Sequence, residues 1–205
     1  WVCEYYAQNA QTQLAPKTIT TDATESYVSY EPLGVVLAVM PWNYPFWQVF
    51  RFAAPALMAG NVALLKHASN VMESAMNIQR VFERAGFPKS CFTNLPLRSD
   101  KIEGIIKNSR VKAVTLTGSK PAGSAVAATA GSEIKKSVLE LGGSNALVVF
   151  EDCNMDETIK TAVQARFQNT GQSCIAGKRL LLHKDIAEEF TQKFVAKVKE
   201  LQSGD

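Results

Sequence analysis

The sequence predicts an α/β fold built on a doubly wound, mostly parallel sheet, followed by the start of a second α/β domain. Segments typical of strands alternate with segments typical of helices along most of the chain, as in a series of right-handed crossovers. The first strand of this series, residues 35–40, is continuously apolar, as expected for a strand that is covered on both faces. With 205 residues, of which 46% are hydrophobic, the chain can bury a sizeable core.

The N-terminal part is predicted to be a short helix followed by an exposed ribbon. Residues 4–14 have a helical pattern, and residues 17–30 are rich in Thr, Ser and Tyr with polar alternation, which is typical of a two-stranded ribbon. After the strand at 35–40, two prolines bracket Pro41-Trp42-Asn43-Tyr44-Pro45. Because a proline restricts the residue before it, this segment is predicted to be a turn.

The other elements follow from apolar runs, helical periodicity and stop signals. Gly60 ends the predicted helix at residues 46–59, Gly86 and Pro88 end the one at 70–85, and Ser99 is predicted to cap the one at 100–108. The predicted helices cover residues 46–59, 70–85, 100–108, an alanine-rich segment after residues 118–123, 156–167 and 186–201. The predicted strands cover residues 62–66, 91–95, 113–117, 136–141, 146–150 and 178–183.

Composition and charge exclude several classes of protein. The net charge is +3 and the basic residues are scattered among acidic ones, so no nucleic-acid partner is expected. Four cysteines in no paired short spacing, with two histidines, predict neither a metal site nor a disulfide framework, and they favour a reducing, cytoplasmic compartment. No apolar run approaches the roughly 20 residues of a membrane span, so no membrane partner is expected. Because the sequence opens on Trp1, we interpret it as an internal piece of a longer protein.

Polar residues follow the carboxyl ends of several predicted strands, where doubly wound sheets bind ligands. Trp42 and Asn43 follow one strand, Lys66 ends the next, and Gly118 and Ser119 lead from a strand into a helix. Backbone N–H groups at that helix start can hold a phosphate, but the pattern is weaker than a full dinucleotide fingerprint, so a plain strand-to-helix turn is the alternative. Lys66 is either a solvated strand end or a ligand contact.

Asn43 and Trp42 also have two interpretations each. Asn43 is either a turn residue that tolerates unusual backbone angles or an amide donor to a developing oxyanion. Trp42 is either a packing residue, as aromatic residues usually are, or part of the ligand site.

Cys174 and Glu140 suggest acyl-transfer chemistry. Cys174 ends a polar, glycine-containing loop whose residues cannot form an apolar wall, and Lys178 and Arg179 follow closely, where they can favour the thiolate. Glu140 lies in an otherwise apolar strand, which is costly unless the carboxylate is solvated in a cleft, as a general base would be. A thiol nucleophile and a water-activating carboxylate are what transfer through a thioester requires.

The alternative for a lone cysteine is a buried packing residue. Cys3, Cys91 and Cys153 lack the polar surroundings of Cys174 and are interpreted as structural.

These motifs resemble the aldehyde dehydrogenase superfamily in order and approximate spacing, over essentially the whole chain. Residues 40–49 and Leu64-Leu65-Lys66-His67-Ala68 are most similar to the succinate-semialdehyde dehydrogenase branch. The motifs that carry the resemblance are Pro41-Trp42-Asn43-Tyr44-Pro45, Lys66, Thr117-Gly118-Ser119, Leu139-Glu140-Leu141-Gly142-Gly143 and Asn169-Thr170-Gly171-Gln172-Ser173-Cys174.

The resemblance implies a Rossmann-like fold and the NAD(P)-dependent oxidation of a small aldehyde, with succinate semialdehyde as the favoured substrate. Cys174 would attack the aldehyde, and the Asn43 side chain and the Cys174 backbone N–H would hold the resulting oxyanion. Hydride transfer to the nicotinamide would leave a thioester, and Glu140 would activate the water that hydrolyses it. A coenzyme A-acylating enzyme is the rival within the superfamily, but such enzymes dispense with this glutamate.

The resemblance also implies the residues that contact the cofactor. Lys66 and Ser69 would face the adenosine ribose. Gly118 and Ser119 would face the pyrophosphate, and Trp42 and Leu141 would line the path of the cofactor.

Two positions depart from the pattern of related enzymes. Members that use NAD strictly often carry a glutamate where this chain has Ser69, so both NADP and NAD are expected to bind. Many succinate-semialdehyde enzymes hold the substrate carboxylate with an arginine at the position of Gln168. Arg166 lies nearby and is either a substitute for that arginine or a solvated helix end.

By the same resemblance, residues 1–141 would be the NAD(P)-binding domain, with residues 17–30 as a bridging ribbon for oligomerisation. Residues 142–205 would begin the catalytic domain. We expect a homodimer or homotetramer when the enzyme is complete, and little turnover from these 205 residues alone. The alternative from another class is a non-catalytic nucleotide-binding or interaction protein derived from a dehydrogenase fragment.

Overall fold

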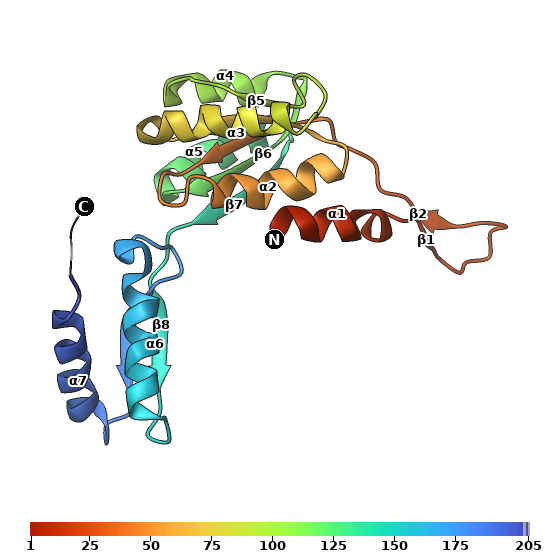
Figure 1. Cartoon of the computed structure of the whole chain (residues 1–205). Coiled ribbons are helices and arrows are strands. Elements are labelled where there is room, and N and C mark those ends of the chain that lie inside the picture. Colours follow the sequence, from red (N-terminus) through yellow and green to blue (C-terminus); the bar gives the residue numbers. More distant parts are fainter. Residues whose placement is uncertain (203, 205) are drawn as a thin grey trace. The chain divides into compact units, whose positions relative to one another are not determined.

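The structure is a computed structural model that describes residues 1–202 and 204. The chain forms two compact units, Trp1–Leu141 and Gly142–Asp205. The first unit is built around a five-stranded sheet, and the second contains a two-stranded sheet (Figure 1).

The five-stranded sheet has the order β5-β4-β3-β6-β7, and each neighbouring pair of strands is parallel. The chain runs outward from β3 through β4 to β5, then returns to place β6 on the other side of β3. The order therefore reverses between β3 and β6, which confirms the predicted doubly wound, parallel sheet. The strands are β3 (Val35–Met40), β4 (Val62–His67), β5 (Phe92–Asn94), β6 (Val111–Gly118) and β7 (Lys136–Leu141).

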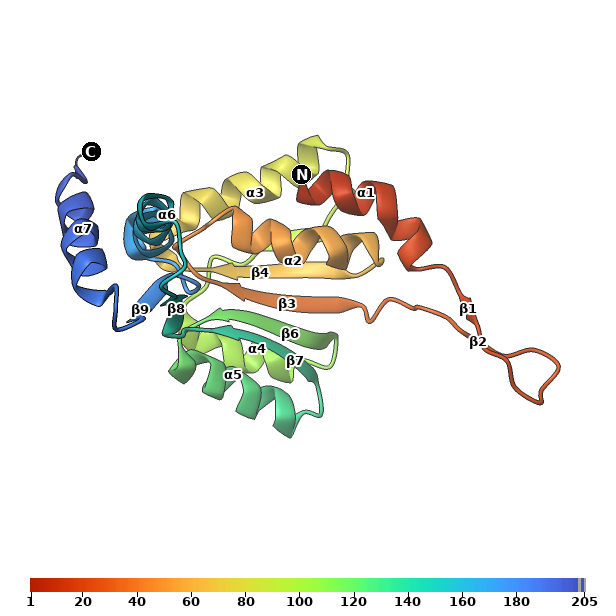
Figure 2. The ribbon, with the colours of Figure 1, turned by 90° about the horizontal axis from the view of Figure 1, so that it is seen from below.

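Helices cover both faces of this sheet, as Figure 2 shows. Helices α2 (Trp47–Met58) and α3 (Met72–Arg84) lie on one face, and α4 (Ile102–Lys107) and α5 (Lys120–Ser132) lie on the other. Successive side chains of a strand point to opposite faces, so β3 supplies Ala38 to the core under α2 and Leu37 to the core under α4 and α5. This double burial explains why β3 is apolar at every position.

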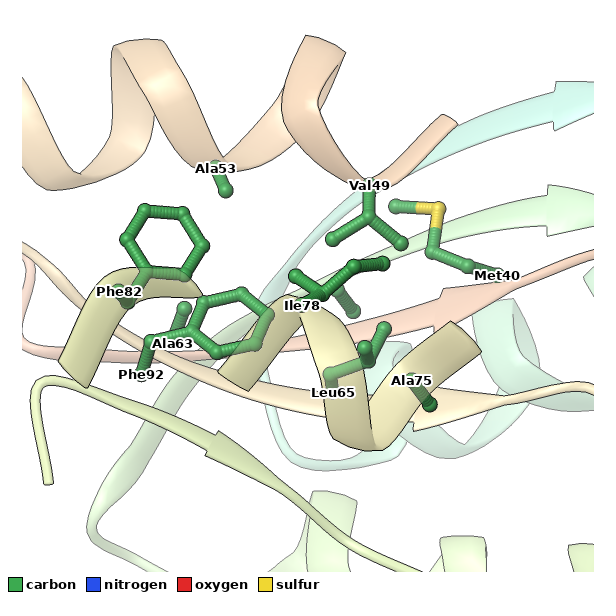
Figure 3. Close-up of a cluster of buried hydrophobic side chains, with 10 residues drawn as sticks. Met40, Val49, Ala53, Ala63, Leu65, Ala75, Ile78, Phe82 and Phe92 are labelled. Carbon is green, nitrogen blue, oxygen red and sulfur yellow. The ribbon is translucent and has the colours of Figure 1, made fainter. Parts of the chain in front are cut away.

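The core beneath α2 and α3 is centred on phenylalanine side chains (Figure 3). The ring of Phe82 stacks on Phe92, with the ring centroids 4.5 Å apart, and on Phe50, at 5.4 Å. Val49 from α2 and Ile78 from α3 are fully buried in the same cluster. These contacts fix α2 on the sheet. The helix begins shortly after the turn at residues 41–45.

The N-terminal segment has the helix and ribbon that the sequence predicts. Helix α1 (Val2–Gln13) comes first, and β1 (Lys17–Thr18) then pairs antiparallel with β2 (Tyr27–Val28). The paired strands are short and exposed. Their role in oligomerisation stays a prediction.

Two local predictions differ from the structure. Ser99 does not cap a helix at residues 100–108, because it begins a 3₁₀ turn, η2 (Ser99–Lys101), that precedes α4, and its hydroxyl contacts Lys66 instead. The alanine-rich helix α5 begins at Lys120, so Gly123 lies inside it. Other predicted bounds agree within about two residues, the usual uncertainty of helix and strand ends. A second 3₁₀ turn, η1 (Ser69–Val71), precedes α3.

The second unit begins as a strand, helix and parallel strand. Strands β8 (Asn145–Val149) and β9 (Gly177–Leu182) are connected through α6 (Met155–Phe167) and the turn η3 (Gln168–Gly171), and α7 (Ala187–Lys199) follows. Its core includes Val149, Ile159, Ala162 and the fully buried Phe190. Among the residues that the structure describes, every helix is too short or too polar for a membrane crossing.

Candidate functional site

Asn43 lies at the centre of a turn that joins the carboxyl end of β3 to helix α2. The side chain of Asn43 is half-buried, and its Oδ1 atom lies inside the protein. Trp42, in contrast, is 45% exposed, so it is not the core residue that one interpretation suggested. The turn at residues 41–45 is as predicted.

Lys66 and His67 end strand β4 and point to opposite faces of the sheet. Lys66 is buried and donates a hydrogen bond from Nζ to Ser99 Oγ at 3.3 Å. His67 is completely buried and contacts the carbonyl oxygens of Met40 and Pro45 on the side of α2. Burial lowers the pKa of Lys66 and that of His67. Lys66 is therefore not a solvated strand end.

A pocket of about 270 Å³ lies between α4, α5 and the carboxyl ends of β3 and β6. We call it the Ser99 pocket. It lies where the strand order reverses, which is the usual ligand position in open parallel sheets. Ser99, which lines this pocket, accepts a hydrogen bond from Lys66, so the lysine ammonium lies next to a lining residue. Its lining includes Val39, Ser99, Ile102, Leu116, Ala122 and Val126.

Gly118 and Ser119 connect the end of β6 to helix α5. Ser119 is the N-cap of the helix, and its Oγ accepts a hydrogen bond from the backbone N–H of Ala122 at 3.4 Å. Gly123 brings the first turn of α5 against β7, because a Cβ at that position would lie 2.6 Å from a methyl carbon of Leu141. The segment thus combines a capped helix N-terminus with close packing of helix and strand.

Glu140 is an exposed residue near the carboxyl end of the edge strand β7. It lines a groove of about 570 Å³ under α2, which we call the Glu140 groove. Thr117 is the partner of Glu140 in the neighbouring strand. Glu140 is thus exposed at a groove, as expected for a carboxylate in an otherwise apolar strand, and its role as a general base stays a prediction. Its lining includes Gln48, Arg51, Thr117, Lys136, Val138 and Glu140.

Arg51 is a potential functional residue that the sequence reasoning missed. It projects from α2 into the Glu140 groove and donates from Nη2 to Thr117 Oγ1 at 3.3 Å. Gln48, one turn earlier, is buried, and its Oε1 has no hydrogen-bond partner in the part of the chain that the structure describes. A lone arginine within the apolar pattern of residues 46–59 was the signal that could have revealed this site.

Cys174 follows a turn with unusual backbone conformation in the second unit. Asn169, Thr170 and Gly171 have φ values of 54°, 54° and 75°. Positive φ is costly for a β-branched residue such as Thr170, and strained backbone often occurs at functional sites. Cys174 itself is half-buried and unpaired. Its approach to Glu140 and Asn43, which belong to the other unit, stays a prediction.

The other three cysteines are also unpaired, and two of them contact the cores. Cys91 packs against the core beneath α2 and α3, and Cys153 packs against the core of the second unit. Cys3 is exposed on α1. Within residues 1–202 and 204, no three histidine, cysteine, aspartate or glutamate side chains gather in a way that could hold a metal ion.

The cations that follow Cys174 hold backbone carbonyl groups. Lys178 Nζ donates to the carbonyl oxygens of Gly143, at 2.7 Å, and of Cys174, at 3.1 Å. Arg179 Nε donates to the carbonyl oxygen of Ser144 at 2.9 Å. These contacts tie the segment after Cys174 to residues 143–144, and any effect of the two cations on the thiol stays a prediction.

Arg166 braces the turn before Cys174. Its Nη1 donates to the Gly171 carbonyl oxygen at 3.4 Å, and its guanidinium lies over the ring of Phe167, 5.4 Å from the centroid. A Cβ on Gly171 would lie 2.6 Å from Arg166 Nη1. Arg166 is thus not a fully solvated helix end.

The fold of the first unit defines a doubly wound α/β protein with a pocket at the point where the strand order reverses. Comparison with known proteins gives the family. Residues 1–205 match the Aldehyde dehydrogenase family, and the chain belongs to this family.

Individual relatives are similar over the whole chain. A probable NADP(+) succinate-semialdehyde dehydrogenase of Synechocystis is 53% identical over 204 residues, covering 100% of this chain and 45% of the relative. The NADP(+) succinate-semialdehyde dehydrogenase of Mycobacterium avium is 56% identical, with coverages of 98% and 43%. The crystal structure of succinic semialdehyde dehydrogenase from Streptococcus pyogenes with NADP+ matches with a TM-score of 0.97 and 34% identity, with coverages of 100% and 45%. The chain thus spans less than half the length of these relatives.

Proposed function

We propose that this chain contains the cofactor-binding domain and the beginning of the catalytic domain of an NAD(P)-dependent aldehyde dehydrogenase. Residues 1–141 bind NAD(P), residues 17–30 form a bridging ribbon in a homodimer or homotetramer, and residues 142–205 open the catalytic domain. The substrate is succinate semialdehyde, which is oxidised to succinate. The observation that carries the proposal is the Ser99 pocket at the strand-order reversal, with the Lys66 ammonium hydrogen-bonded to Ser99.

The residues around this pocket fit the adenosine part of a nicotinamide dinucleotide. Apolar side chains from α4 and α5 suit the faces of a purine, and Lys66 suits a ribose hydroxyl or a phosphate. The backbone N–H groups of Gly118 and Ser119, at the start of α5, suit the pyrophosphate. Trp42 and Leu141 line the path toward the nicotinamide, which accepts a hydride when it is bound.

The chemistry of the substrate is assigned to three residues of this chain. The sulfur of Cys174 attacks the aldehyde carbon, and the Asn43 amide and the Cys174 backbone N–H stabilise the oxyanion. Once the hydride has left, the acyl group remains on Cys174 as a thioester. Glu140 removes a proton from the water that attacks this thioester, and the carboxylic acid leaves.

Ser69 favours the use of NADP as well as NAD. It is exposed at the start of η1, two residues after the end of β4 and three residues beyond Lys66, and it carries no charge that would repel a 2′-phosphate. The names of the Synechocystis and Mycobacterium avium relatives support NADP and succinate semialdehyde. Titration of the complete polypeptide with both cofactors tests this point, because NAD binding at least about tenfold more tightly than NADP would contradict it.

Alkylation with iodoacetamide near neutral pH tests the catalytic proposal. Cys174 is expected to react faster than the half-buried Cys91 and Cys153, and succinate semialdehyde should protect Cys174 selectively. The exposed Cys3 is the control, because it lies on α1, outside the proposed catalytic site, and the aldehyde should leave its reaction unchanged. A non-catalytic protein derived from a dehydrogenase would show no aldehyde protection at any cysteine.

A further inference from the structure

We propose that His67 is a positioning residue, whose neutral imidazole ties the turn that carries Asn43 to the end of strand β4. The inference rests on the proposed function, in which Asn43 stabilises the oxyanion. The His67 ring is completely buried and lies within hydrogen-bonding distance of three backbone groups. Two of these groups lie at the two ends of the turn, and one belongs to the residue after β4.

The hydrogen bonds define which ring nitrogen carries the proton. The backbone N–H of Ala68 donates to Nδ1 of His67 at 2.9 Å, so Nδ1 must present a lone pair. The proton therefore lies on Nε2, which donates to the Pro45 carbonyl oxygen at 3.0 Å. The carbonyl oxygen of Met40 lies 3.3 Å from Nδ1, and it can accept a hydrogen bond only from a protonated Nδ1. Burial lowers the pKa of His67, and the nearby Lys66 charge acts in the same direction, which favours the neutral ring.

The position of this ring relates it directly to the candidate oxyanion donor. Met40 is the last residue of β3, and Pro45 is the last residue of the turn, so the two carbonyl groups that face His67 bracket Asn43. Pro45 also directly precedes the start of α2 at residues 46–47. A hydrogen bond from His67 to Pro45 therefore fixes the turn at its junction with α2.

Lys66, the residue before His67, points to the opposite face of the sheet. Lys66 contacts Ser99, a lining residue of the Ser99 pocket, while His67 contacts the turn, because successive strand residues point to opposite faces. The dipeptide thus joins the proposed cofactor pocket and the catalytic turn through one rigid strand. The simple alternative is that His67 only fills space in the core.

A pair of amide substitutions separates these two roles. Glutamine places its amide nitrogen about where Nε2 lies and can donate to Pro45, whereas asparagine is too short to reach it. In the complete polypeptide we expect His67→Gln to retain kcat within about threefold. We expect His67→Asn to lower kcat about tenfold or more, with the KM for NADP nearly unchanged, because small displacements of a catalytic group are costly. Equal kcat values for the two variants would overturn the inference.

A double-mutant cycle with Asn43→Ala shows whether His67 acts through Asn43. If it does, adding His67→Asn to Asn43→Ala should lower kcat no further. A full multiplicative loss in the double variant would contradict the tether. If Asn43→Ala alone leaves kcat unchanged, the proposed function of Asn43 fails instead, so the two failures are distinct.

Nitrogen NMR of the wild-type protein tests the tether without any variant or turnover. The Nδ1 resonance of His67 should show an unprotonated nitrogen near neutral pH, and Nε2 should show a proton that exchanges slowly with solvent. A proton on Nδ1 under these conditions would overturn the inference, whether or not the substituted proteins fold.

Discussion

Lys66 Nζ donates a hydrogen bond to Ser99 Oγ across 3.3 Å, which joins the end of β4 to the 3₁₀ turn that lines the Ser99 pocket. The two residues are 33 positions apart in the sequence. Their contact brings a cation from one strand end to a pocket formed mainly by α4 and α5.

Replacement of Lys66 by methionine should weaken cofactor binding with little effect on kcat. Loss of one ammonium contact to the cofactor should raise the Kd for NADP about tenfold, which corresponds to ~1.4 kcal/mol. Lys101→Met is the matched control, because Lys101 is an exposed lysine of the same 3₁₀ turn and pairs with the exposed Asp100. Equal Kd values for the wild type and Lys66→Met, measured by calorimetry, would remove Lys66 from the cofactor site.

Arg51 should determine the preference for an aldehyde that carries a carboxylate. Arg51→Met is expected to raise the KM for succinate semialdehyde about tenfold or more and to leave the KM for the uncharged butanal almost unchanged. Only succinate semialdehyde has a carboxylate that can accept a charged hydrogen bond from the Arg51 guanidinium. Arg166→Met is the comparison. Since Arg166 braces the turn before Cys174, its loss should lower kcat for both aldehydes. A loss of discrimination in Arg166→Met instead would assign the carboxylate contact to Arg166.

Two glycines of helix α5 should respond in opposite ways to alanine. At Gly131 a Cβ would meet no atom within 4 Å, so Gly131→Ala should stabilise the protein by about 0.5–1 kcal/mol through helix propensity. At Gly123 the Cβ would lie 2.6 Å from a methyl carbon of Leu141, so that side chain must move. Urea unfolding should therefore show Gly123→Ala to be less stable than Gly131→Ala by at least ~1 kcal/mol. Equal stability would mean that α5 and β7 do not require their close approach.

The pH dependence of stability should contain a contribution from His67. Its pKa is lowered from the ordinary value of 6.5, so below that value the unfolded state binds a proton more readily than the folded state. The free energy of unfolding should therefore decrease as the pH falls from about 6.5 toward the lower pKa of the folded state. Its contribution is fully present above about pH 6.5.

Urea unfolding at several pH values checks this expectation. His67→Gln cannot titrate, so its stability should decrease less than that of the wild type over the same range. Parallel curves for the two proteins would show that the folded state does not lower the pKa of His67.

Much of the fold could be predicted because it depends on local patterns. The double burial of β3 leaves a continuous apolar run, and the prolines at 41 and 45 define the turn that follows it. The convergence of Lys66 and Gly118 on one edge also follows from the sequence, since parallel strands present their carboxyl ends together.

The contacts that complete the site could not be predicted in this way. The hydrogen bond from Arg51 to Thr117 spans 66 positions, and the contact from His67 to Pro45 spans 22. Each contact depends on which helix packs over which strand, and local sequence patterns do not determine this packing. Ser99 shows the same limit, because its sequence context resembles a helix cap while its hydroxyl is taken by a distant lysine.

In the proposed reaction Cys174 carries the acyl group, and Glu140 activates the water that releases it. The most direct measurement is mass spectrometry of the Glu140→Gln variant of the complete polypeptide, digested after one turnover with succinate semialdehyde and NADP. We expect a succinyl thioester on the peptide that contains Cys174, about one equivalent of NADPH, and no further turnover. An unmodified Cys174, or an acyl group on Cys3, Cys91 or Cys153, would contradict it.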